Sequence, residues 1–95
     1  MGNRWGNNGN SVRLYLERLR TLKQARNTLE ACETMLQATQ ASLQTYQAKY
    51  EAGTVSASEL LQQQERYLSA LNDYVQNKYT YIISEKVLRI YLGKN

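Results

Sequence analysis

The chain of 95 residues contains the stretch Glu51-Ala52-Gly53-Thr54-Val55-Ser56-Ala57-Ser58-Glu59, which decides its fold. Gly53 can adopt the left-handed conformation that commonly ends a helix. Ser56 can cap a following helix, and Glu59, three residues later, completes the S-x-x-E pattern of a capping box. The stretch therefore predicts two helices joined by a tip over residues 52–56. Because the connection is short, the two helices must be antiparallel neighbours.

Both flanks of the tip are free of strong helix breakers. The chain has no proline, and three of its five glycines lie within the first ten residues. Proline costs about 3 kcal/mol in a helix interior and glycine about 1 kcal/mol, so their absence permits long helices. We expect one helix over about 11–51, capped by Ser11, and one over about 57–92, ended by Gly93. Residues 1–10, MGNRWGNNGN, are typical of a flexible leader or of the remnant of a loop or an added sequence.

Apolar residues recur at intervals of seven on both flanks, which is the period of helices that form a coiled coil. The first flank has two such series, Tyr15, Leu22, Leu29, Leu36, Leu43 and Tyr50, and between them Leu19, Ala25, Cys32, Thr39 and Tyr46. The second flank has Leu60, Tyr67, Tyr74, Tyr81 and Leu88. The sequence therefore predicts an all-α fold, a long antiparallel helical hairpin of the coiled-coil kind.

A second apolar stripe on the C-terminal flank lies directly beside the first. It consists of Leu61, Leu68, Val75 and Ile82, and Leu71 and Leu92 widen the apolar face. One partner helix covers only one seam, so this stripe would remain in water. Burying apolar surface gains about 25 cal/mol per Å², which favours association. We expect the chain to associate with itself, as a four-helix bundle or another helical assembly.

Several function classes are excluded or disfavoured by what the chain contains. It has no histidine and one cysteine, Cys32, so the usual metal sites and histidine-based catalysis are excluded. No nucleophile–base pair or glycine-rich phosphate loop is present, so we expect neither an enzyme nor a bound cofactor. A basic cluster between residues 13 and 26 is interpreted as a solvated helix face, with nucleic-acid or anionic-lipid binding as the alternative. The cluster consists of Arg13, Arg18, Arg20, Lys23 and Arg26.

The residues around the tip resemble a known family. The run from Tyr50 to Leu61, YEAGTVSASELL, is similar to the hairpin tip of TolC-like outer-membrane efflux proteins. The pattern of that tip is an aromatic residue, then a glycine, a small or polar stretch, an acidic residue and two aliphatic residues. The preceding run 41–49 and the run from Tyr79 to the closing Leu92-Gly93 resemble the helices that enter and leave that tip. The resemblance covers about residues 31–93 and is closest to the second of the family's two internal repeats.

The resemblance implies a role in transport. In this family, three protomers each contribute two such hairpins to a periplasmic α-helical tunnel, and a separate β-barrel crosses the outer membrane. The hairpin tips meet a periplasmic adaptor (membrane fusion) protein, which links the channel to an inner-membrane pump. The chain would then be a periplasmic segment, not itself membrane-spanning, of an outer-membrane protein in a Gram-negative bacterium.

The family's functional positions map onto this sequence residue by residue. The adaptor-docking tip corresponds to Ala52, Gly53, Thr54, Val55 and Ser56, and the tunnel-entrance positions correspond to Tyr50, Glu59 and Gln62. Gln62 replaces an acidic residue of the best-known member, and Val55 replaces a basic one, which argues against a tightly latched entrance. The alternative function is a generic coiled-coil interaction module without a transport role, and a third is a small helical nucleic-acid binder.

Overall fold

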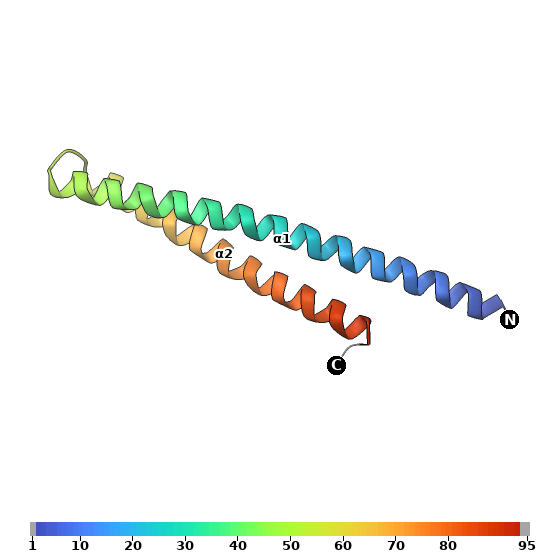
Figure 1. The fold of residues 1–95 in the computed structure, drawn as a ribbon. Coiled ribbons are helices and arrows are strands. Elements are labelled where there is room, and N and C mark those ends of the chain that lie inside the picture. Colours follow the sequence, from blue (N-terminus) through green and yellow to red (C-terminus); the bar gives the residue numbers. More distant parts are fainter. Residues whose placement is uncertain (1, 94–95) are drawn as a thin grey trace.

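The computed structural model describes the backbone of residues 2–93 and the side chains of residues 11–93. It contains two helices, α1 (Gly2–Glu51) and α2 (Ala57–Tyr91), which fold back on each other as an extended hairpin (Figure 1). The molecule measures 78 × 22 × 14 Å. The prediction of an all-α, antiparallel helical hairpin is confirmed.

The helix boundaries at the tip agree with the sequence, whereas the N-terminal boundary differs. α1 ends at Glu51 and α2 begins at Ala57, as the capping signals predict. α1 starts at Gly2, upstream of the start expected at Ser11, so Ser11 lies inside the helix and does not cap it. Glycine and asparagine cost only about 1 kcal/mol or less each in a helix, which an established helix can extend through. The side chains of residues 1–10, on which a leader was expected, lie outside the described residues.

The face of α1 that packs against α2 follows the predicted heptads. The half-buried residues of α1 are the members of the two predicted series and, in addition, Ser42. Tyr50 is the one member of the series that is not half-buried, because it is 45% exposed. Tyr50 lies in the last turn of α1, beside the loop, where the partner helix is only beginning. The seam between the helices therefore runs from Tyr15 to Tyr46.

The seam of α2 contains a second heptad series that hydrophobic spacing does not predict. Leu60, Tyr67, Tyr74 and Tyr81 are half-buried and Leu88 is buried, as expected. Between them lies a series of small or polar residues at the same interval of seven, Gln63, Ala70, Asn77 and Ser84, all of them buried or half-buried. Among the described side chains, only Ala70, Leu88 and Gln63 are less than 9% exposed. The hairpin therefore has a thin interface in place of a wide core.

Two polar contacts cross the seam and fix its register. Ser42 donates a hydrogen bond from Oγ to Oε1 of Gln63 at 2.8 Å, and Nδ2 of Asn77 lies 3.5 Å from Sγ of Cys32. At the open end, Tyr91 Oη donates to the carbonyl oxygen of Ser11 at 3.1 Å. In Figure 1 the ribbons lie closest near the tip and further apart toward the open end.

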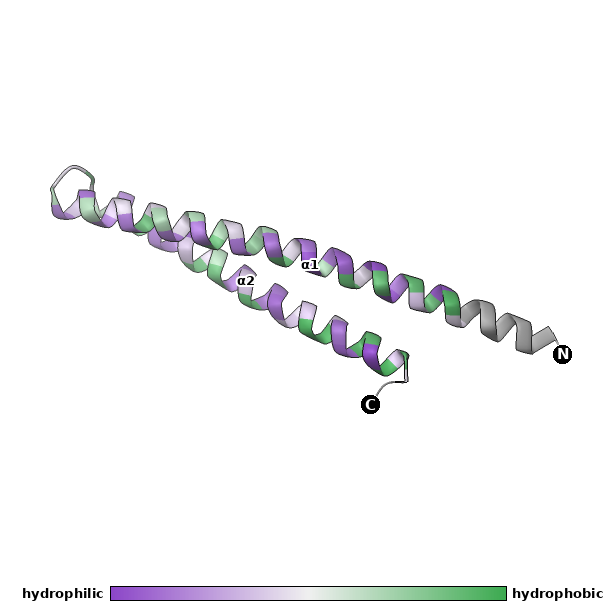
Figure 2. Cartoon of the chain, in the orientation of Figure 1, coloured by the Kyte–Doolittle hydropathy of each residue, from purple (hydrophilic) through white to green (hydrophobic). Residues whose placement is uncertain are grey.

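The second stripe of α2 is exposed, as predicted, with one correction. Leu61, Leu68 and Val75 are between 41% and 60% exposed, but Ile82 is half-buried. A straight α-helix drifts by about 20° per heptad relative to an exact seven-residue repeat, which turns Ile82 toward the seam. The outward positions are taken instead by Tyr79 and Ile83, which are 63% and 59% exposed. Figure 2 shows hydrophobic residues, in green, recurring along the ribbons of both helices.

Candidate functional site

The tip begins with a helix C-terminus held by three hydrogen bonds. Gly53 has a φ of +78°, and its N–H donates to the carbonyl oxygen of Tyr50 at 3.0 Å. Thr54 donates twice to the carbonyl oxygen of Lys49, from its N–H at 2.9 Å and from its Oγ1 at 3.0 Å. The two backbone bonds form a Schellman motif, which satisfies the last carbonyl groups of the helix. The predicted role of Gly53 as a left-handed helix stop is confirmed.

The other half of the tip is the capping box that the sequence predicts. Ser56 is the N-cap of α2, and its side chain accepts from the N–H of Glu59 at 3.1 Å. In return, the Glu59 carboxylate accepts from the N–H of Ser56 at 3.4 Å. Val55 and Leu60, both half-buried, occupy the two positions of a hydrophobic staple, which fixes the angle at which the chain enters the helix. The tip is therefore a closed connection with its backbone bonded on both sides.

The tip presents a small surface to solvent. Ala52, Gly53, Thr54 and Ser56 are exposed, whereas Val55 is half-buried. A methyl group built on Gly53 would meet no atom within 4 Å, so the space beside this residue is open. Of the five predicted docking residues, four thus form the outer surface of the tip, and Val55 contributes mainly to its support.

The three candidate entrance residues lie near the same end of the hairpin. Tyr50 is in the last turn of α1, Glu59 is in the first turn of α2, and Gln62 is one turn further along α2. All three are exposed. Glu59 is also committed to the capping box, so its carboxylate is held in place and does not point freely into solution. The hairpin brings these residues to one end of the rod but does not by itself enclose an opening.

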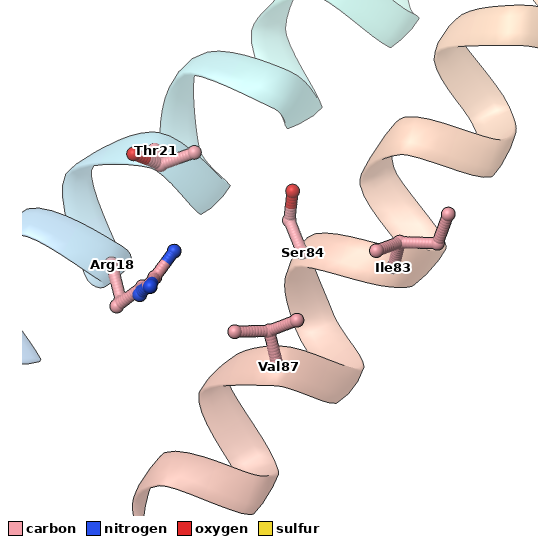
Figure 3. Close-up of a pocket in the computed structure, with 5 residues that line it drawn as sticks. All are labelled: Arg18, Thr21, Ile83, Ser84 and Val87. Atoms are coloured by element: carbon pink, nitrogen blue, oxygen red, sulfur yellow. The ribbon is translucent and has the colours of Figure 1, made fainter.

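Two shallow clefts lie along the seam, away from the tip. One, of about 140 Å³, is lined by Arg18 and Thr21 from α1 and by Ile83, Ser84 and Val87 from α2 (Figure 3). The other, of about 250 Å³, lies between Cys32 and Ala70 and is also lined by Thr28, Ala31, Met35 and Asp73. Both are smaller than typical small-molecule sites, and neither gathers the acid, base and nucleophile that catalysis needs. They are packing gaps between two helices that touch along a thin seam.

Charge is distributed unevenly along the hairpin. Residues 11–26 and 83–93, which form the open end, carry seven basic and two acidic side chains, a net charge of +5. Residues 27–82, which include the tip, carry three basic and six acidic side chains, a net charge of −3. Two ion pairs, Arg26–Glu30 at 3.6 Å and Arg89–Glu85 at 3.4 Å, are exposed and contribute little to stability. The basic cluster is therefore one end of a dipolar rod.

Within the described residues, no group of three or more potential metal-binding side chains occurs. Neither helix has, over its described length, an apolar segment sufficient to pass through a bilayer.

Comparison with family models gives one match, to the outer membrane efflux protein family, over residues 11–94. The chain belongs to this family. The match covers the whole tip, α2 and α1 from Ser11 onward, so the resemblance inferred from the tip residues is confirmed. It also begins nearer the N-terminus than the resemblance did, at residue 11 instead of about residue 31. Comparison with curated proteins and comparison with solved structures give no match.

Membership of the family determines the functional class. Outer membrane efflux proteins are transport proteins and not enzymes, in agreement with the prediction from the residues. The hairpin is thus a helical segment of an efflux-type protein. Sequence reasoning found the tip residues, but it missed the polar seam of Gln63, Asn77 and Ser84. The signal that could have found this series is its exact spacing of seven, three residues after each apolar seam position.

Proposed function

We propose that this chain is the periplasmic hairpin of a trimeric outer-membrane efflux or type I secretion channel, and that its tip docks a periplasmic adaptor protein. Through the adaptor, the hairpin would be coupled to an inner-membrane pump. The observation that carries the proposal is the tip itself. It combines a Schellman motif and a capping box within eleven residues, 49–59, in a chain that belongs to the efflux family.

The construction of the tip suits it to docking. A loop that is already bonded on both sides loses little conformational entropy when a partner binds, so more of the contact energy remains as affinity. The exposed surface consists of small side chains and one glycine, which lets the backbone of a partner approach closely. The exposed backbone around Ala52, Gly53 and Thr54 would supply the contact with the helical tips of the adaptor.

The proposed entrance role concerns Tyr50, Glu59 and Gln62. In a trimer, equivalent tips would converge around one axis, and the exposed ring of Tyr50 would narrow the opening. Glu59 would place a carboxylate near the rim while it caps α2. Because Gln62 is neutral, the rim would hold less negative charge than an entrance with two acidic residues per hairpin.

The proposal is tested by binding of the hairpin to a purified adaptor protein from an efflux system, measured for two matched glycine variants. Gly53 and Gly93 both follow a helix C-terminus, with φ of +78° and +74°, and both have open space beside them. Replacement by asparagine, which tolerates this conformation, adds a side chain without a large backbone penalty. Gly53→Asn should weaken binding about tenfold or more, whereas Gly93→Asn should not change it.

The same experiment separates docking at the tip from the alternative of a generic interaction module. A module that binds through its helix faces would bind the adaptor equally well in both variants. Binding that is insensitive to Gly53→Asn would therefore reject adaptor docking at the tip, while leaving the fold and the family unaffected.

A further inference from the structure

The smaller of the two seam clefts combines polar and apolar groups from both helices. Its volume is about 140 Å³, and it lies at the open end, lined by Arg18, Thr21, Ile83, Ser84 and Val87. In Figure 3 the guanidinium group of Arg18 and the hydroxyl group of Ser84 point into the space between the helices, and Val87 adds an aliphatic side chain. This gap between the helices therefore presents hydrogen-bond donors from α1 and α2 beside an apolar wall.

We propose that this cleft binds the carboxylate group of an amphiphilic molecule whose remaining part is an aliphatic chain. The inference concerns the end of the hairpin opposite to the tip and is independent of adaptor docking. Because the two helices of one hairpin form the cleft, it needs no second copy of the chain and is compatible with an assembly in which all tips lie at one end. Three observations support it: the free donors, the charge and the apolar surface beside them.

Both polar groups that face the cleft are without a protein partner among the described residues. The two ion pairs found there use Arg26 and Arg89 and do not include Arg18. Thr80, one turn before Ser84 on α2, donates its hydroxyl to a carbonyl oxygen of its own helix at 3.1 Å. Ser84 is half-buried but makes no such bond within the described part of the chain. The cleft thus holds two donors that a ligand can satisfy.

The charge of the cleft matches one carboxylate. Arg18 is the single charged residue of its lining, and a guanidinium group binds a carboxylate through two parallel hydrogen bonds. The two acidic residues of the open end do not compete for it. Glu85 is paired with Arg89 at 3.4 Å, and Glu17 directly precedes Arg18, about 100° further round α1. The net charge of +5 at this end also raises the local concentration of anions.

An apolar surface continues from the cleft toward the open end. Leu14, one turn before Arg18 on α1, is 43% exposed, and Tyr91, one turn after Val87 on α2, is 37% exposed. Residues four apart share a face of a helix, so both lie in line with the cleft. The hydroxyl of Tyr91 donates to the carbonyl oxygen of Ser11 at 3.1 Å, so this residue spans the two helices. An aliphatic chain attached to the carboxylate would cover this surface, whereas a nucleic acid has no aliphatic group to place there.

The size and exposure of the cleft limit its affinity. A cavity of about 150 Å³ holds a group the size of benzene, so the cleft of about 140 Å³ takes the carboxylate and only the first carbons of the chain. Because Arg18 is exposed, water screens its attraction for the ligand. We expect a dissociation constant of roughly 0.1–1 mM for an aliphatic carboxylate of medium length.

Titration of the full chain with decanoate at neutral pH, followed by the amide resonances of the isotope-labelled protein, tests the proposal. The amides of residues 18–21 and 83–87 should shift together with a dissociation constant in this range. Decanol, which has the chain without the charge, and acetate, which has the charge without the chain, should each bind about tenfold more weakly or worse. The proposal would be overturned if either bound as tightly as decanoate, or if decanoate at up to about 5 mM left these amides unshifted.

A matched pair of arginine variants separates a specific site from general attraction to the basic end. Arg18→Gln should weaken decanoate binding about tenfold. Arg20→Gln removes the same charge from an exposed position of α1 that does not line the cleft, and should change binding by less than about twofold. Arg18→Lys keeps the charge but loses the paired hydrogen bonds, so its affinity should be intermediate. Equal losses in Arg18→Gln and Arg20→Gln would contradict the proposed site, and circular dichroism would verify that each variant remains helical.

Discussion

Replacing Ser42 by alanine removes the hydrogen bond that holds the buried Gln63 across the seam. Ser42 Oγ donates to Oε1 of Gln63 at 2.8 Å, and Gln63 is only 8% exposed. A buried acceptor that loses its partner costs about 1–3 kcal/mol, so we expect Ser42→Ala to lower the free energy of unfolding by about 1–2 kcal/mol. The variant leaves the backbone and the apolar part of the seam unchanged.

Replacing the other partner of this hydrogen bond, Gln63, should cost less than replacing Ser42. In Gln63→Leu, Ser42 can bond the carbonyl oxygen four residues earlier in its own helix, as Thr45 does at 3.1 Å, so its hydroxyl need not be left without a partner. The double variant Ser42→Ala/Gln63→Leu replaces both polar groups by apolar ones. Such a replacement is nearly neutral or stabilising, so the double variant should be at least as stable as the wild type.

Urea unfolding followed by circular dichroism measures these effects. With a slope of about 1.5 kcal/mol per molar urea, a loss of 1–2 kcal/mol moves the midpoint down by about 1 M. All variants must be compared at one protein concentration, because self-association would make the midpoint depend on concentration. A Ser42→Ala variant with an unchanged midpoint, or a double variant less stable than Ser42→Ala alone, would refute the role assigned to this polar contact.

Three further predictions concern the tip and the seam. Ser56→Ala removes the N-cap of α2 and should cost about 1 kcal/mol in urea unfolding. Ser58→Ala, two residues later at the second position of the helix, should change stability by less than about 0.5 kcal/mol. Gly53→Ala meets no steric obstacle but forces alanine to a φ of +78°, so it should cost about 1–2 kcal/mol, and Gly53→Asn should cost less. Asn77 is a polar seam residue in contact with Cys32, and Asn77→Leu makes this position apolar. The melting temperature, measured by thermal circular dichroism, should rise by a few degrees. A fall would indicate that the amide is needed for stability.

The fold could be predicted from the sequence because its signals are local. Gly53, Ser56 and Glu59 act through backbone geometry and short-range hydrogen bonds, which do not depend on distant parts of the chain. The heptad series on α1 likewise predicts the packed face, since the period of a helix alone determines which residues share a side. The tip and the seam of α1 therefore agree with prediction almost residue by residue.

The differences arise where sequence spacing does not determine the environment. Gln63 and Asn77 are polar, so a search for apolar periodicity passes over them, although small or polar residues fit a seam in which the helices are close. Ile82 turns toward α1 because helical drift accumulates over three heptads, and Ile83 takes its outward place. Ser11 is a good N-cap residue, but a cap signal does not stop a helix that continues upstream of it. The role of the candidate site, in contrast, depends on partners and not on the chain alone.

The central claim, that the tip is the docking surface, is tested most directly by a cysteine cross-linking scan against a purified adaptor protein. In a Cys32→Ala background, single cysteines would be placed at Thr54 in the tip and at the exposed positions Gln37 and Ser69 along α1 and α2. Docking at the tip predicts that Thr54→Cys cross-links to the adaptor and that the other two do not. Cross-links at Gln37 or Ser69 with none at Thr54 would contradict it and would indicate an interaction along the helix faces.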